Sequence, residues 1–277
     1  MIKDILSHWQ DWQLAEIEPR RENLKPLPGG LTNRCFLLPL DTGLYVLRIH
    51  GQNSRALDID REAEFRIQRL VAARGLAPAV RYRSQDGHYW IRDYAPGKTL
   101  TSQDLSLPLL KAMASHLASL HALPLPDDVP LLSVADKASH YWNMIAAQPD
   151  MVAVCELRAE LQSAFARAPD NRRCLCHMDP LPANWIQADD GSLTLLDWEY
   201  AAIGHPLWDL AALLSHARLS EDEERQVLHA YGSRNLQGWD MAREQMNYLS
   251  ALWYGAQGIW SARELEACLR GLLALSY

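Results

Sequence analysis

The sequence lacks any run of about 18 uncharged apolar residues, so we expect no membrane-spanning helix. Residues 1–9 carry charge early and have no long apolar core, so we expect no signal peptide. Cysteine is scarce: the chain has five, an odd number without the spacing of a disulfide framework (Cys35, Cys155, Cys174, Cys176 and Cys268). We therefore expect reduced thiols and a cytoplasmic location.

An excess of basic residues is also missing. The formal net charge is -7, which argues against a general nucleic-acid binder, because such proteins normally carry a basic patch. A hydrophobic share of 48% excludes disorder. Cys174 and Cys176 stand beside His177, but no second ligand pair follows at zinc-like spacing, which favours structural cysteines. What remains is a folded chain of 277 residues, enough for one or two domains.

The first third of the sequence predicts strands with a single helix. Two apolar segments, 35–40 and 44–49, are separated by Asp41-Thr42-Gly43, which indicates a β-hairpin. Apolar residues then recur at helical spacing over residues 60–74. Two more strands are expected at 79–83 and 88–92. The predicted order is strand, strand, helix, strand, strand.

Pro96-Gly97 ends this pattern and predicts a crossover between two lobes, residues 1–94 and 95–277. The second lobe has the composition and spacing of a mainly helical region. The expected helices cover residues 108–120, 134–147, 152–168, 207–217, 221–231 and 240–275, the last in two pieces.

The pattern H-x-D-x-x-x-x-N places His177, Asp179 and Asn184 in its three fixed positions. After a turn at 189–191, an apolar strand is expected at 193–196, directly before Asp197. Phosphoryl transfer needs a carboxylate that orients or deprotonates the acceptor hydroxyl, and oxygen ligands that hold Mg²⁺ against nucleotide phosphates. The pattern indicates that Asp179 serves the hydroxyl and that Asn184 and Asp197 bind Mg²⁺. The alternative is a chance arrangement of ordinary turn residues.

With its flanks, this region resembles the aminoglycoside phosphotransferase and choline kinase superfamily, most closely its choline- and thiamine-kinase branch. The resemblance rests on the stretch 176–210, with the motifs 197–201 and 206–211, and it extends upstream to 28–34 and 45–49. It implies an α+β, bilobal protein-kinase-like fold. The N-lobe would hold an antiparallel sheet with one helix, and the C-lobe would be mainly helical.

The resemblance also implies an ATP site in the N-lobe. Glycines without a Cβ let the backbone approach phosphate oxygens, although a glycine pair is often just a turn. Backbone groups of the hinge would hold adenine. The residues assigned to the nucleotide are Gly29, Gly30, Thr32, Asn33, Arg48, Glu64, Asp93, Tyr94 and Ala95.

Arg48 stands in a strand where charge is costly unless it meets a partner. Its expected partners are ATP phosphates and a helix carboxylate. Glu64 is the preferred carboxylate and Glu62 the alternative, while an exposed helix charge is the plainer interpretation of Glu64. Arginine at this position resembles the choline-kinase branch, whereas aminoglycoside kinases generally have lysine.

Three residues resemble the acceptor pocket of choline kinases, where aromatic rings surround a trimethylammonium group. They are Tyr200, Trp253 and Gln257. Core packing is the alternative, because the chain has ten Trp and ten Tyr. Residues 211–219 lack the acid that the choline-kinase pattern has there, which favours a substrate held by stacking, such as thiamine, over choline.

The sequence therefore predicts an ATP- and Mg²⁺-dependent kinase for a small cationic alcohol of thiamine or choline type, with no nucleic-acid or membrane partner. An aminoglycoside or sugar kinase is the second possibility. A nucleotide-binding pseudokinase is the third, although such proteins usually lose Asp179, Asn184 or Asp197, and all three are present. The identity of the alcohol and the oligomeric state stay open.

Overall fold

The computed structural model describes residues 2–28, 32–51, 54, 57–167, 169–232 and 237–275. The chain divides into two compact units, unit 1 with residues 1–101 and 183–200 and unit 2 with residues 102–182 and 201–277. This division differs from the predicted lobes, 1–94 and 95–277. The reason is strand pairing, because the segment 98–99 pairs with 185–187 and draws both segments into unit 1.

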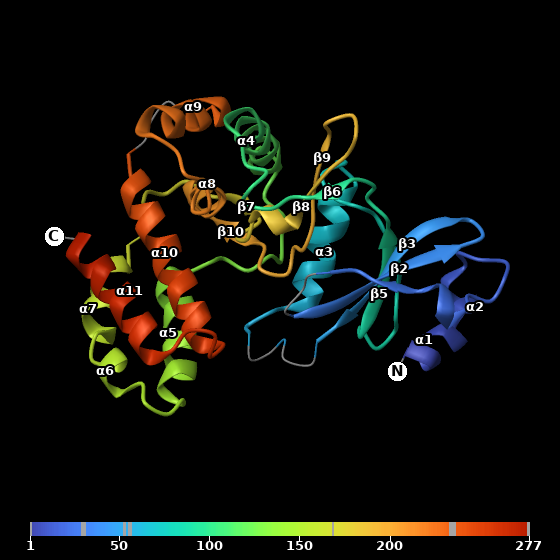
Figure 1. Ribbon diagram of the computed structural model, residues 1–277, viewed down its shortest axis with the longest axis horizontal. Coiled ribbons are helices and arrows are strands. Elements are labelled where there is room, and N and C mark those ends of the chain that lie inside the picture. Colours follow the sequence, from blue (N-terminus) through green and yellow to red (C-terminus); the bar gives the residue numbers. More distant parts are fainter. Residues whose placement is uncertain are drawn as a thin grey trace. The chain divides into compact units, whose positions relative to one another are not determined.

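Unit 1 is built on a five-stranded antiparallel sheet with the order β1-β2-β3-β5-β4. Figure 1 labels its strands β2, β3 and β5. Arg48 lies opposite Cys35 on one neighbouring strand and opposite Trp90 on the other. The predicted order of two strands, one helix and two strands is confirmed. The elements are β1 (Lys25–Pro26), β2 (Asn33–Leu40), β3 (Gly43–His50), α3 (Arg61–Ala72), β4 (Val80–Arg83) and β5 (Tyr89–Asp93).

The two faces of this sheet differ because side chains alternate along each strand. Leu47 and Ile49 of β3 lie in a buried apolar cluster with Trp12 and other residues of two N-terminal helices, α1 (Ile2–Ser7) and α2 (Trp9–Trp12). Val46 and Arg48 alternate with them and line a cavity. The N-terminal helices were not predicted, since six and four residues are too few to show a helical period. By covering one face they leave the other for a ligand.

A second, three-stranded sheet of unit 1 has the order β6-β8-β9, formed by β6 (Lys98–Thr99), β8 (Trp185–Gln187) and β9 (Leu193–Leu195). The strand predicted at 193–196 is therefore present. Two short 3₁₀ helices, η1 (Arg21–Asn23) and η2 (Pro182–Asn184), precede β1 and β8. The backbone N–H of Leu196 donates to the carbonyl of Asn184 at 2.8 Å, which brings Asn184 beside the end of β9.

Unit 2 is mainly helical, as predicted, with one two-stranded antiparallel pair, β7 (Cys174–Cys176) and β10 (Ala202–Gly204). Its helices are α4 (Leu107–His121), α5 (Val134–Ala146), α6 (Val152–Cys155), α7 (Arg158–Phe165), α8 (Pro206–Leu214), α9 (Glu221–Tyr231), α10 (Trp239–Ala256) and α11 (Ala262–Leu275). Across the described ranges, none of the helices combines the length and apolarity needed to cross a membrane.

Two of the predicted helices of unit 2 were too long. The helix expected at 152–168 is two helices, because the Leu157 N–H bonds to the carbonyl of Val154, three residues back, and this tighter turn interrupts the α-helical pattern. Residue 168 itself lies outside the described residues. The helix expected at 207–217 ends at Leu214, where the hydroxyl of Ser215 caps the carbonyl of Ala212 at 2.7 Å.

Candidate active site

Arg48 is the centre of a buried ion network in unit 1. It is 4% exposed, and its guanidinium bonds to Glu64 and, at 2.6 Å, to Oδ1 of Asp197. Its Nη2 also lies 3.2 Å from Oε2 of Glu199, and its charge stands 4.8 Å from the ring centre of Trp90. Burial alone would lower the pKa of Arg48, but the carboxylates, Asp197 first, outweigh it and raise this pKa. The side chain is therefore a fixed cation.

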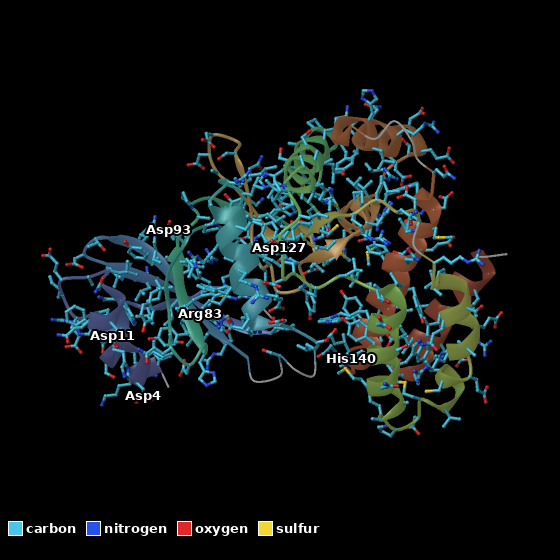
Figure 2. The ribbon with its side chains drawn as sticks, turned by 180° about the vertical axis from the view of Figure 1, so that it is seen from behind. Asp4, Asp11, Arg83, Asp93, Asp127 and His140 are labelled. Atoms are coloured by element: carbon cyan, nitrogen blue, oxygen red, sulfur yellow. The ribbon has the colours of Figure 1, made fainter. Side chains whose placement is uncertain are left out.

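Glu64, and not Glu62, contacts Arg48. The Asp60 carboxylate accepts the N–H groups of Glu62 and Ala63, so α3 begins at Arg61 and turns Glu64 inward, where it is 1% exposed. Glu62 points outward to Arg83, whose Nη1 donates to Oε2 at 2.9 Å; Figure 2 labels Arg83.

Glu199 is a site residue that the sequence interpretation quoted in a motif without giving it a role. Its Oε2 accepts hydrogen bonds from Asn33 Nδ2 at 2.7 Å and Arg61 Nη1 at 3.0 Å, and its Oε1 accepts from Thr32 Oγ1 at 2.5 Å. At 8% exposure it joins the start of β2 to α3. The signal that could have found it is a second carboxylate two residues after Asp197. Gly29 and Gly30 lie outside the described residues.

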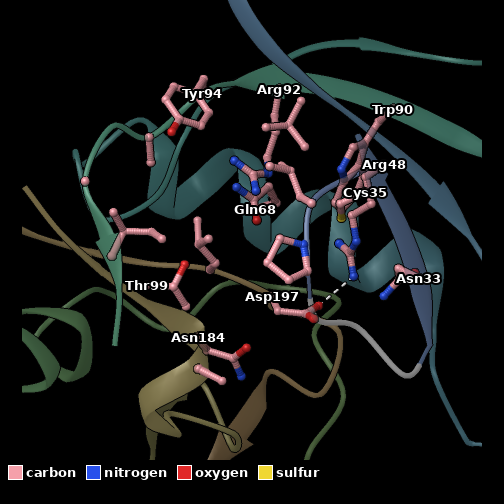
Figure 3. A pocket seen from close by; sticks show the side chains of 18 residues that line it. Asn33, Cys35, Arg48, Gln68, Trp90, Arg92, Tyr94, Thr99, Asn184 and Asp197 are labelled. Carbon is pink, nitrogen blue, oxygen red and sulfur yellow. Dashed lines mark hydrogen bonds and ion pairs between the residues drawn. The ribbon is translucent and has the colours of Figure 1, made fainter. Parts of the chain in front are cut away.

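Asp197 and Asn184 lie at one side of a cavity of about 200 Å³ in unit 1, which Arg48, Trp90 and other residues of the sheet also line (Figure 3). Asp197 adopts a left-handed backbone conformation with φ of 65°, and its side chain is 28% exposed. Left-handed conformations are uncommon outside glycine, although aspartate adopts them more often than most residues, and this one holds the carboxylate in a direction that a regular strand would not give.

Two of the three predicted hinge residues line the same cavity. Tyr94 and Ala95 line it. The Asp93 side chain is instead paired with Arg81 at 2.7 and 2.8 Å, and the Asp93 N–H bonds to the carbonyl of Ala79 at 2.9 Å. At position 93 the group that could meet a ligand is thus the backbone carbonyl, which also accepts a hydrogen bond from Arg92 Nη1 at 3.0 Å.

The loop that carries Asp179 belongs to unit 2 and is held by Asp209 of α8. Asp209 is fully buried, and its two oxygens accept the backbone N–H groups of His177 and Met178, both at 2.7 Å. Met178 has a left-handed φ of 68°, and the N–H of Asp179 donates to Nδ1 of His177 at 3.2 Å. Asp209 belongs to a segment quoted for the family resemblance, but no role was predicted for it.

Asp209 is itself positioned by a histidine. Nε2 of His121, on α4, lies 2.9 Å from Asp209 Oδ2, and Nδ1 of the same ring lies 2.8 Å from the Tyr231 hydroxyl. The Asp209 carboxylate is an acceptor, so His121 donates to it from Nε2. Helices α4, α8 and α9 thereby fix the backbone before Asp179.

The predicted acceptor residues fall in different places. Tyr200 is half-buried at the end of the second segment of unit 1. Trp253 and Gln257 lie in the last turn of α10 and at its C-cap, in unit 2. The rings of Trp253 and Tyr254 meet edge to face, with 5.3 Å between their centres. The rings of Tyr254 and Trp260 are stacked, with 4.9 Å between their centres and 14° between their planes. Half-buried aromatic rings therefore gather at the C-terminal end of α10.

Comparison with known proteins agrees with this geometry. Residues 23–245 match the model of the phosphotransferase enzyme family, and the chain belongs to that family. Ethanolamine kinase 2 of Mus musculus is 24% identical over 223 residues, 76% of this chain and 55% of the relative. A thiamine kinase of Escherichia coli is 26% identical over 227 residues, 81% of this chain and 77% of the relative. The chain thus spans only about half the length of the ethanolamine kinase.

The fold is shared with a solved choline kinase. The structure of choline kinase LicA from Streptococcus pneumoniae superposes with a TM-score of 0.81 at 22% sequence identity, over 100% of this chain and 99% of the other. The predicted kinase-like α+β fold and the predicted superfamily are confirmed.

Proposed function

We propose that this chain transfers the γ-phosphoryl group of ATP, with Mg²⁺, to the hydroxyl of a small cationic alcohol of thiamine or choline type. The observation that carries the proposal is Arg48. A fixed cation between Glu64 and Asp197 faces a cavity that Asn184 also lines. Buried arginine is suited to phosphate recognition, since its fork of N–H donors matches phosphate oxygens. Membership of the phosphotransferase family supports the same reaction.

The residues of the network suit a hard divalent cation. Glu64, Asp197 and Glu199 each offer an oxygen, and these oxygens lie within 4.8 Å of one another. Oxygen ligands are those that Mg²⁺ prefers. Glu64 and Glu199 are engaged by Arg48 and Arg61, whereas Asp197 is partly exposed to the cavity. Asp197, with Asn184, would therefore hold the ion, which when bound would neutralise phosphate charge.

The chain's own residues then have separate tasks. Arg48 would hold the α- and β-phosphates, and the backbone near Asp93, Tyr94 and Ala95 would hold the base. Asp179 would orient the acceptor hydroxyl and receive its proton, while the acceptor oxygen bonds to the γ-phosphorus and the bond to the bridging β-γ oxygen breaks. Positioning and charge neutralisation supply most of the acceleration in reactions of this kind.

For the acceptor we favour a thiamine-like alcohol. The stacked rings of Tyr254 and Trp260 beside Trp253 suit a flat, cationic heterocycle, and residues 211–219 carry no acid to pair with an ammonium group. A thiamine kinase is among the relatives. An aminoglycoside or sugar substrate and a regulatory pseudokinase remain the alternatives. All five cysteines are free thiols, which supports a reducing, cytoplasmic setting.

The test is ADP release with ATP, Mg²⁺ and a panel of choline, ethanolamine, thiamine, homoserine, simple sugars and kanamycin. We expect thiamine to be turned over fastest when it competes with choline. A strong preference for choline would overturn the choice of thiamine, and turnover of kanamycin or sugars alone would overturn the substrate class. No turnover of any acceptor, with MgATP bound, would favour the pseudokinase.

A further inference from the structure

Arg92 is a second arginine of the cavity, and no role follows for it from the phosphate site. It lies near the end of β5, on the same face as Trp90 and opposite Val46 of β3. Along β5, Arg92 lies two residues closer to Tyr94 and Ala95 than Trp90 does, and Trp90 is the residue paired with Arg48. Figure 3 shows it lining the cavity with Arg48 and Tyr94. Arg92 thus belongs to the end of the cavity where the base would lie.

Within the described part of the chain, the guanidinium of Arg92 lacks the direct ion pairs that Arg48 makes. Arg48 has three carboxylate partners, whereas no acidic group among the described residues forms an ion pair with Arg92. Its hydrogen bond runs from Nη1 to the backbone carbonyl of Asp93, at 3.0 Å. Burial lowers the pKa of Arg92 and the charge of Arg48 adds to that effect, while Cys35, Asp197 and Asp93 oppose it in part. Arg92 is half-buried, and a partly desolvated cation without a paired carboxylate is costly, so acceptor atoms of a ligand would offset that cost.

The hydrogen bond to Asp93 also affects which base fits. The Asp93 carbonyl is the group at this position that could accept from the 6-amino group of adenine, and one of its two lone pairs is already engaged by Arg92. Arginine has donors only, so the 6-amino group would meet further N–H groups. A 6-oxopurine presents two acceptors there, O6 and N7, which match the arginine fork.

We propose that Arg92 reads the 6-oxo edge of a purine, so that this site takes GTP and ITP as phosphoryl donors in addition to ATP. The inference rests on the proposed function in one respect, namely that a nucleotide occupies this cavity. It adds a specificity-determining residue for the base, separate from the phosphate-binding arginine.

The experiment measures dissociation constants of MgATP, MgGTP and MgITP without an acceptor, by titration calorimetry, for the parent and Arg92→Met. ITP lacks the 2-amino group of GTP and so isolates the 6-oxo contact. Arg81→Met is the matched control, because Arg81 bonds to the Asp93 side chain and does not line the cavity. Circular dichroism and thermal melting establish that each variant is folded.

We expect the parent to bind GTP and ITP at least as tightly as ATP. Arg92→Met should weaken the binding of GTP and of ITP about tenfold relative to the binding of ATP. Arg81→Met should leave these relative affinities unchanged. If the dissociation constants for GTP and ITP, each divided by that for ATP, stay within about twofold of the parent values in Arg92→Met, the inference is wrong. Binding of ATP in the same experiment would still support the nucleotide site. Binding of none of the three nucleotides would contradict the proposed function itself and the inference with it.

Discussion

The carboxylate of Asp209 accepts the backbone N–H of His177 at 2.7 Å and so fixes the start of the loop that carries Asp179. A second bond of the same length, to the Met178 N–H, supports the left-handed conformation of that residue. Both bonds are charge-assisted and buried, which makes them stronger than bonds between neutral groups. Asp209 is a positioning residue, since it reaches Asp179 only through the backbone.

Asp209→Asn should therefore destabilise the protein. An amide in place of the carboxylate turns one of the two acceptors into a donor that faces an N–H, at a cost of about 1–3 kcal/mol. Urea unfolding followed by circular dichroism measures the loss. Asp222→Asn is the control, because its side chain is 80% exposed on α9. An Asp209→Asn variant as stable as the parent would contradict the role given to this carboxylate.

The two predicted metal ligands should contribute unequally to the binding of MgATP. Asp197→Ala should reduce Mg²⁺-dependent ATP binding more than Asn184→Ala does, because a carboxylate supplies charge that an amide lacks. Calorimetry with MgATP and with ATP in EDTA separates the metal effect from the loss of other contacts. Asp190→Ala, in the turn of the same β8–β9 hairpin, is the control. Unchanged MgATP affinity in Asp197→Ala would show that the metal assignment is wrong.

His50 should make the protein sensitive to mild acid. Burial, assisted by the charges of Arg48 and Arg61, lowers the pKa of His50 from 6.5 to about 2. The folded protein then binds no proton at this ring where the unfolded chain does, so stability falls as pH drops below the unfolded pKa, by up to about 1.4 kcal/mol per pH unit.

The variant His50→Gln removes that titration. Between about pH 6 and pH 5, the parent should lose more unfolding free energy than His50→Gln, and the difference should be up to about 1 kcal/mol. His8→Gln, at an exposed position, serves as the control for loss of a histidine. Equal slopes for the parent and His50→Gln would argue that the ring titrates in the folded state.

Trp253→Ala tests the acceptor pocket. If this ring stacks on the substrate, its loss should raise KM for the acceptor roughly tenfold, because ground-state binding appears mainly in that constant. KM for ATP is the internal control and should not change. A rise in both constants, or in neither, would assign Trp253 to packing against Tyr254 and not to substrate binding.

The ion pair of Arg48 and Glu64 could be predicted, because both residues lie in elements that short-range sequence patterns indicate. The family resemblance indicated Glu64, on the helix expected at 60–74, as the partner of Arg48, and the strand expected at 44–49 placed Arg48 in the sheet. Glu199 and Asp209 escaped prediction because their partners are remote in the chain, as with Asn33 and Glu199, which are 166 residues apart. The left-handed backbone of Met178 was equally hidden, since methionine does not signal a positive φ, and at Asp197 the modest preference of aspartate for this region was not enough to predict it.

The central claim is that the chain phosphorylates a small cationic alcohol with Asp179 serving the hydroxyl. The most direct measurement is product formation from thiamine, ATP and Mg²⁺ by the parent and by Asp179→Asn, with fold and ATP binding checked for both. We predict thiamine phosphate from the parent and turnover lower by about 10²–10⁴-fold in Asp179→Asn, because the amide cannot accept the proton. Near-normal turnover in Asp179→Asn, or no phosphorylated product from thiamine or choline with the parent, would contradict the account.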